Sequence, residues 1–152
     1  MYELMKLLHV CAVVLFLGNI TTGLFWHRHA LRTGQPALLA HTVDGIIRSD
    51  RWFTIPGVVV ITVTGLIAAM VGRIPILGTP WLFGALVLFA VSGVVFMAFV
   101  APLQKQLLVQ ARAQAFDLAA YRKTALQWAL WGALALITPF GALALMLLKP
   151  TL

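Results

Sequence analysis

Four long runs of apolar residues, separated by three more polar connections, dominate the pattern of this chain. The runs cover residues 4–26, 53–71, 81–103 and 125–148. At a rise of about 1.5 Å per helical residue, each run is long enough to cross a hydrocarbon core about 30 Å thick. The pattern therefore predicts an all-α integral membrane protein, a four-helix bundle that forms one transmembrane domain over residues 1–152.

The first connection carries a helical pattern of its own. Between residues 37 and 51 the apolar and the polar side chains fall on opposite faces, with Leu39, Val43 and Ile46 on one and His41, Asp44, Arg48 and Arg51 on the other. We expect the first two spans to continue beyond the membrane as a helical hairpin that turns near Gly34 and Pro36. We expect the third span to extend similarly over residues 105–121, and the connection over residues 72–80 to form a tight turn. Three prolines inside the runs predict kinks, namely Pro56, Pro102 and Pro139.

Composition narrows the class of protein. Of the 152 residues, 62% are hydrophobic and only 10% are charged, which is too few charges to cover a soluble domain. The net charge of +7 does not indicate a nucleic-acid partner, because the basic residues flank the apolar runs instead of forming one face. The expected surroundings are a lipid bilayer.

The distribution of the basic residues predicts an orientation. The two long connections carry eight of them, Arg28, Arg32, Arg48, Arg51, Lys105, Arg112, Arg122 and Lys123, and the opposite side carries three, Lys6, Arg73 and Lys149. Positive charge stays on the cytoplasmic side, so we expect both termini outside (N-out, C-out) in a bacterial inner membrane. The aromatic residues support the same orientation, because Trp and Tyr favour the membrane interfaces. We expect the inner interface to hold Trp26, Trp52, Trp128 and Trp131, and the outer interface to hold Tyr2 and Trp81.

His9, about two turns inside the first span, is the strongest candidate for chemistry. Imidazole can ligate haem iron or another metal, or relay a proton near neutral pH. The alternative is an interfacial histidine that stays hydrated, as Lys6 does. Asn19, deeper in the same span, could line a polar seam with Thr21 and Thr22, or could form a structural hydrogen bond between helices.

Two further histidines could form a pair. His27 follows His9 by eighteen residues, so the two share a helix face at a separation of about 27 Å. His41 follows the turn at Gly34 by about as many residues as His27 precedes it, which could bring them together as a bis-histidine or metal site. The alternative is that they are solvated, as we expect for His29. The spacing matches no zinc signature, so we expect no structural metal.

Asp50 falls on the apolar face of the first connection, at the expected membrane boundary. A carboxylate there needs a partner, and we expect Arg28 or Arg32 to supply it. Asp44 and Arg48, four residues apart, predict a surface ion pair. Because all four acidic residues are expected at or outside the boundaries, we predict no mid-membrane carboxylate of the kind that proton-driven transporters use.

Several segments carry a family resemblance. The segments KLLHVCAVVLFLGN, FWHRHA, RSDRWFTIPG and the terminal LLKP together resemble a bacterial family of four-span inner-membrane proteins without assigned activity. That family is similar in turn to the haem-binding four-span protoporphyrinogen oxidases and to the copper-resistance D family. The resemblance covers nearly the whole chain.

The resemblance to the haem-binding group implies a role for His9. In that group a histidine follows a lysine by three residues and a second histidine closes the same helix, which Lys6, His9 and then His27 or His29 match. The resemblance thus implies that His9 is an axial ligand of haem b. The second span holds no histidine or lysine to match the oxidases' second ligand, so the resemblance does not extend to protoporphyrinogen oxidation.

Three functions are therefore compatible with the sequence. The first is a haem-linked or redox function with His9 as outer ligand and His27 and His41 as an inner pair. The second is a small-molecule or metal permease subunit in which Asn19 and threonines form a polar pathway. The third is a non-catalytic accessory protein that forms a homo-oligomer or docks a membrane partner.

Overall fold

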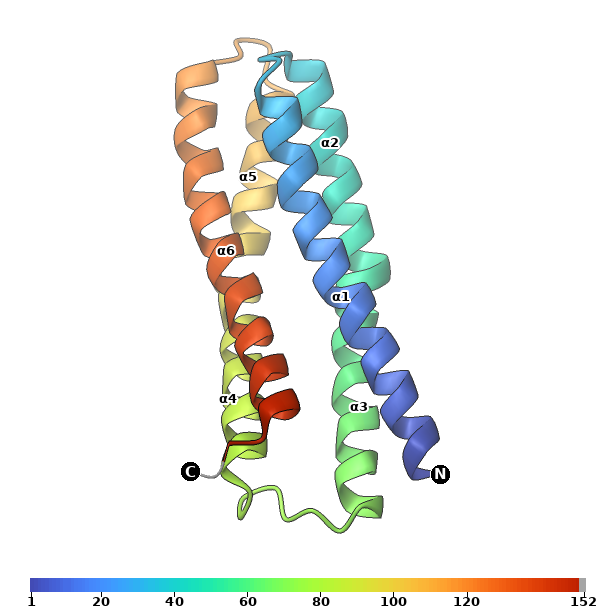
Figure 1. Ribbon diagram of the computed structural model, residues 1–152. Coiled ribbons are helices and arrows are strands. Elements are labelled where there is room, and N and C mark those ends of the chain that lie inside the picture. Colours follow the sequence, from blue (N-terminus) through green and yellow to red (C-terminus); the bar gives the residue numbers. More distant parts are fainter. Residues whose placement is uncertain (151–152) are drawn as a thin grey trace.

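A computed structural model describes residues 1–150, which fold into four long helical rods (Figure 1). The first rod is α1 (Tyr2–Leu31) and the fourth is α6 (Leu118–Leu148). The second rod consists of α2 (Pro36–Ser49), the π-helical segment η1 (Asp50–Thr54) and α3 (Ile55–Val71). The third rod consists of α4 (Pro80–Val95), the π-helical segment η2 (Phe96–Val100) and α5 (Ala101–Ala111). Each rod is long and apolar enough to cross a membrane. The predicted all-α, four-helix membrane fold is confirmed.

The N-terminus and the C-terminal end of α6 lie at the same end of the bundle, which we call the terminal end (Figure 1). The α1–α2 turn and the α5–α6 loop lie at the other, which we call the basic end because most of the basic residues lie toward it. The α1–α2 turn forms where expected, since Gly34 adopts φ 65° and Pro36 begins α2. Such a φ favours glycine, and proline suits the first turn of a helix because its missing amide would have no partner there.

The third rod ends earlier at the basic end than the sequence predicted. Helix α5 stops at Ala111, whereas we expected a helical extension over 105–121. The reason lies in the next helix, because Asp117 is the N-cap of α6 and its side chain accepts hydrogen bonds from the amides of Ala119 and Ala120. An N-cap residue takes a non-helical conformation, so the chain before it must leave the helix.

Two prolines interrupt their rods and a third does not. Pro56 and Pro102 each follow a five-residue π-helical segment, η1 and η2, as the second residue of the next helix. Proline cannot donate to the carbonyl four residues earlier and its ring crowds that group, so the preceding turn widens. Pro139 lies within the continuous helix α6.

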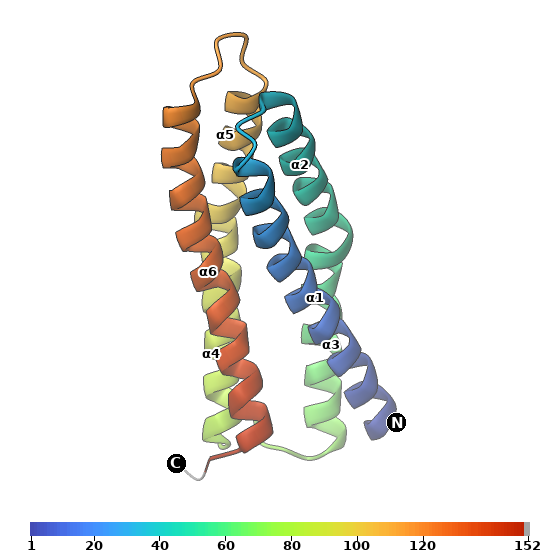
Figure 2. The same cartoon turned by 45° about the horizontal axis from the view of Figure 1, so that its top comes forward.

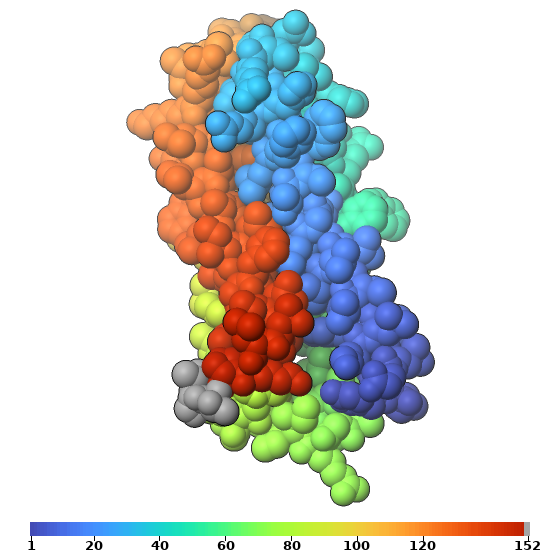
Figure 3. Space-filling model, viewed as in Figure 1, coloured from blue at the N-terminus to red at the C-terminus, as the bar shows by residue number. Residues whose placement is uncertain are grey.

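The packing of the rods changes at the level of these two π segments. Toward the basic end α2 packs on α5, and α1 and α6 complete a four-helix arrangement (Figure 2). Toward the terminal end α1 pairs with α3 and α4 pairs with α6, and within the described residues α3 has no Cα within 8 Å of α4 or α6. Figure 3 shows a furrow between the terminal-end parts of α1 and α6.

The tightest packing lies at the basic end. The largest fully buried side chains are Leu39, Val43, Leu107 and Tyr121, and all four lie outside the predicted membrane spans. A second, smaller cluster lies toward the terminal end, where Phe16 meets Phe89 edge-on with ring centroids 5.8 Å apart. This contact joins the α1–α3 pair to α4.

Replacing Leu107 with alanine is expected to destabilise the protein by about 2–5 kcal/mol, because a fully buried leucine leaves a cavity. Val109→Ala on the same helix is the control, since Val109 is 71% exposed. Reversible unfolding in mixed detergent micelles, followed by circular dichroism, measures both. Equal losses for the two variants would contradict this account of the core.

Candidate functional site

Asp50 is the centre of a buried polar cluster. It begins η1, is 6% exposed, and accepts three hydrogen bonds. Asn19 Nδ2 donates to Oδ1 at 3.0 Å, Thr54 Oγ1 donates to Oδ1 at 2.7 Å, and Gln104 Nε2 donates to Oδ2 at 2.8 Å. Asn19 Nδ2 also lies 2.9 Å from Thr54 Oγ1. These residues come from three of the four rods, so the Asp50 cluster (Asn19, Asp50, Thr54 and Gln104) ties these rods together.

The partners of Asp50 differ from those that we expected. Among residues 1–150 the carboxylate pairs with no cation, and Arg28 and Arg32 are exposed. The reason is the antiparallel hairpin, in which Asp50 lies sixteen residues after Gly34 and Asn19 lies fifteen residues before it. Asp50 therefore meets α1 at Asn19, which is about 13 Å short of Arg28 along the helix.

A small cavity adjoins the cluster. It measures about 20 Å³, and the residues that line it include Asn19, Asp50, Gln104 and Trp128. This is room for about one water molecule. Trp128 is only 3% exposed, not interfacial as we expected, and its indole Nε1 has no hydrogen-bond partner in the part of the chain described.

His27 lies against α6 and not against His41. It is 3% exposed, and its Nε2 lies 2.9 Å from the hydroxyl oxygen of Tyr121. Its ring also meets Trp128 edge-on, with centroids 4.8 Å apart. His41 is exposed on α2, so the structure does not bring the two histidines together. The partner residue Tyr121 is spaced four and seven residues from the buried Ala125 and Trp128, a helical pattern that could have placed it in the core.

His9 packs against α3. Its Nδ1 lies 2.8 Å from the carbonyl oxygen of Ile61, and Thr64 Oγ1 lies 3.5 Å from the same nitrogen. A carbonyl can only accept, so Nδ1 carries the proton and the lone pair resides on Nε2. The ring fits because Gly65 has no side chain, since a Cβ there would lie 3.0 Å from Cε1 of His9.

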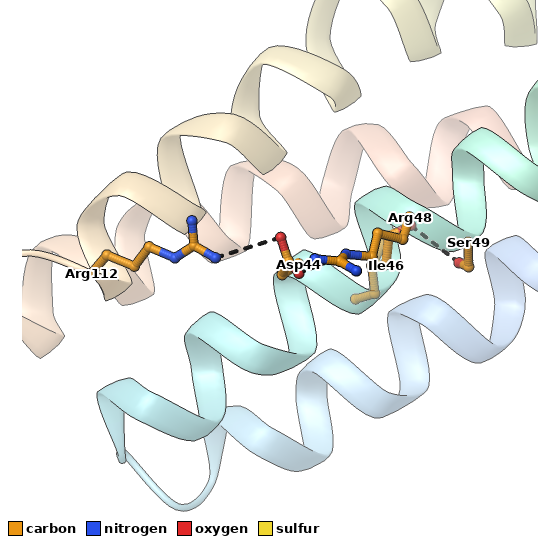
Figure 4. A network of polar contacts seen from close by, with 5 residues as sticks. All are labelled: Asp44, Ile46, Arg48, Ser49 and Arg112. Atoms are coloured by element: carbon orange, nitrogen blue, oxygen red, sulfur yellow. Dashed lines mark hydrogen bonds and ion pairs between the residues drawn. The ribbon is translucent and has the colours of Figure 1, made fainter.

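An exposed ion-pair network joins the second and third rods at the basic end (Figure 4). Asp44 pairs with Arg48 at 2.9 Å and with Arg112, at the end of α5, at 3.5 Å. Both arginine side chains are largely exposed, so screening limits these pairs to about 0–1 kcal/mol. Nearby, the Ser49 hydroxyl donates to the Ile46 carbonyl, and Arg51 is exposed. This network is a surface feature, distinct from the Asp50 cluster.

Comparison with known proteins identifies the family. Residues 3–150 match the model of a family described as "Predicted integral membrane protein (DUF2269)", and the chain belongs to that family. No curated protein and no solved structure matches the chain. The comparisons thus support a multi-pass membrane protein and assign it no activity.

Gly65→Ala is expected to displace the His9 ring and to weaken its bond to Ile61, because the new Cβ would lie 3.0 Å from Cε1 and 3.1 Å from Nδ1. A lost hydrogen bond of this kind costs about 1 kcal/mol. Gly18→Ala is the matched control, since a Cβ there meets nothing within 4 Å. Detergent unfolding of both variants tests the expectation, and a Gly65→Ala protein as stable as Gly18→Ala would refute the close contact.

Proposed function

We propose that this family member is a small membrane permease that carries a proton or a small cation on Asp50. The observation that supports it is a buried carboxylate that meets only neutral donors at the junction of three rods. Ionisable residues inside membrane proteins are costly, and they commonly mark ion and proton pathways. Asn19 lies seven residues inside the expected inner end of the first span, residues 4–26, so its contact with Asp50 supports a position for the carboxylate below the membrane surface.

A purely structural role would not require a carboxylate. An asparagine at position 50 could join the same helices without the desolvation cost of a charge, which reaches several kcal/mol for a buried ion. The neighbours also suit both protonation states. Asn19 and Gln104 donate to the charged form, and rotation of either amide would present an oxygen to accept from the neutral acid. The same two amides can therefore donate to the charged carboxylate or accept from the neutral acid.

The surrounding helices also favour transport. Asp50 begins one of the two π segments, a feature that is frequent at functional sites. Beyond these segments, α3 lacks close contact with α4 and α6 within the described residues. Movement of the α1–α3 pair relative to the α4–α6 pair would keep both pairs intact and would separate Phe16 from Phe89. Such movement could expose the carboxylate alternately to the two sides.

Asp50→Asn is expected to abolish proton uptake while the protein still folds, because an amide retains hydrogen-bonding capacity but cannot exchange a proton at neutral pH. Proteoliposomes that contain a pH-sensitive dye and an imposed potassium diffusion potential measure the flux. Asp44→Asn is the matched control, since Asp44 belongs to the exposed network. The expected result is loss of flux only in Asp50→Asn, and equal flux in all three proteins would rule the proposal out.

A second candidate function is haem binding through His9. Its support is the bond from Nδ1 to the Ile61 carbonyl, because this orientation fixes the ring and leaves Nε2 to ligate iron. Haem b would supply one-electron redox chemistry. Residues 1–150 contain no group of three or more His, Cys, Asp or Glu side chains that could hold a metal, and the cavity beside Asp50 is too small for a porphyrin. His9 would thus act as a single axial ligand at an open site.

Protein expressed with ample haem is expected to show a Soret absorption band after purification if His9 ligates iron, and His9→Ala should lose it. His29→Ala is the control because His29 lies outside this site and is exposed. A wild-type protein without a Soret band, or a band that His9→Ala retains, would eliminate this candidate and leave the Asp50 proposal untouched.

A further inference from the structure

The hydrogen bonds of Asp50 are divided between two halves of the bundle. We call the first and second rods the first half, and the third and fourth rods the second half. Within the first half, Oδ1 of Asp50 accepts from Asn19 at 3.0 Å and from Thr54 at 2.7 Å. Oδ2 accepts from Gln104 of the second half at 2.8 Å. One carboxylate oxygen therefore binds its own half, and the other reaches across to the opposite half.

The bond from Gln104 to Asp50 lies where the two halves begin to separate. Within residues 1–150, two other polar side-chain contacts join the halves, and both lie nearer the basic end. Toward the terminal end, each described side-chain hydrogen bond between rods stays within one half. The contacts nearer the basic end are His27–Tyr121 and Asp44–Arg112, and those within one half are His9–Ile61, His9–Thr64 and Ser92–Ala135. The Asp50–Gln104 bond is thus the described polar contact between the halves that lies closest to the diverging helices.

The two oxygens of Asp50 differ as sites for a proton. Oδ1 accepts two hydrogen bonds and Oδ2 accepts one, so Oδ2 has the larger unused acceptor capacity. A proton taken up from water would bind Oδ2 and neutralise the carboxylate, and the same proton would leave when the carboxyl group ionises again. The neutral acid donates through this O–H, and a donor amide from Gln104 then loses its charged acceptor. Hydrogen bonds to a charged partner are about twice as strong as neutral ones, so protonation weakens the contact between the halves.

We infer that Gln104 is a positioning residue that couples the protonation of Asp50 to the contact between the two halves. With Asp50 ionised, the charge-assisted bond from Gln104 holds the halves together at the junction. With Asp50 neutral, that bond is weakened, and the α1–α3 pair is released to move relative to the α4–α6 pair. This inference rests on the proposed function, and it names the residue through which proton binding moves the helices.

The other titratable groups around the site do not act on this bond. Within the described residues, α3, α4 and η2 contain no titratable side chain. On α1, His27 lies eight residues beyond Asn19 and is bonded to Tyr121. The charged side chains near the cluster on α2, η1 and α5 are exposed or paired with each other, namely Asp44, Arg48, Arg51 and Lys105. Asp50 is therefore the group whose titration changes the bond from Gln104.

Distance measurements between two spin labels test the coupling. The labels are attached to Leu7→Cys on α1 and Leu147→Cys on α6, which are 58% and 73% exposed, and Cys11→Ser removes the exposed native thiol. We expect the mean label distance in detergent micelles to increase when the pH is lowered. Asp50→Asn, which is neutral at every pH, should remove this response. Gln104→Met should give the low-pH distance at every pH, because the bond across the halves is absent.

Gln110→Met is the matched control for Gln104→Met. Gln110 lies on the same helix, and its Nε2 donates to Thr124 at 3.1 Å within the second half, so this variant should keep the response to pH. In the proteoliposome assay, Gln104→Met should move the pH midpoint of Asp50-dependent flux upward by about one to two pH units, because a lost hydrogen bond to a charged group favours the neutral acid about 10- to 100-fold. A purely structural role of Gln104 would lower the flux without moving this midpoint.

The outcomes separate this inference from the proposed function. A label distance that does not respond to pH, or a response that survives in Asp50→Asn or in Gln104→Met, would overturn the coupling; a response that arises from another group, such as His9, would survive in Asp50→Asn. Asp50-dependent flux with an unchanged midpoint in Gln104→Met would overturn the coupling and leave the permease proposal intact. A response that requires both Asp50 and Gln104, in a protein without Asp50-dependent flux, would overturn the permease proposal alone.

Discussion

Apolar side chains associate strongly in water and only weakly in lipid, and the packing of this bundle follows that difference. Leu39, Val43, Leu107 and Tyr121 are the most fully buried large side chains, and they lie in the part of the bundle predicted to extend beyond the membrane. If that part lies in water as predicted, the hydrophobic effect draws the apolar faces of α2, α5 and α6 together. Toward the terminal end, where the predicted membrane spans lie, the rods keep contact mainly in the pairs α1–α3 and α4–α6. The rest of the architecture depends on this closely packed core at the basic end.

The two π-helical segments before Pro56 and Pro102 lie where the packing changes. Pro56 and Pro102 follow η1 and η2, and these segments separate the helices that pack together from the helices that diverge. The Asp50 cluster lies at this junction, where the wider turns and the change of packing leave a small cavity. In lipid, hydrogen bonds such as those from Asn19 and Gln104 contribute about 0.6–2 kcal/mol each, so the cluster also stabilises the junction.

The sequence predicted the features that depend on periodicity and composition. The four spans, the turn at Gly34 and the burial of Asp50 all follow from patterns within one segment. The partners of Asp50 could not be found in this way, because Gln104 lies 54 residues further along the chain and shares no local pattern with it. Trp128 was assigned to the interface by residue type, although its spacing from Tyr121 fits a buried face. Local patterns predict which side chains are buried, whereas the long-range packing decides which of them meet.

The candidate residues differ in whether packing and hydrogen bonding alone account for the side chain found at each position. For His27, the Tyr121 hydroxyl and the Trp128 ring account for its burial, so a role in the core suffices. For His9, a backbone carbonyl holds the ring while Nε2 keeps a free lone pair. For Asp50, three neutral donors satisfy both oxygens but do not neutralise the charge, and a neutral side chain would serve the packing equally well. Packing therefore does not explain why this position carries a carboxylate, whereas the proton exchange that we propose for Asp50 would require one.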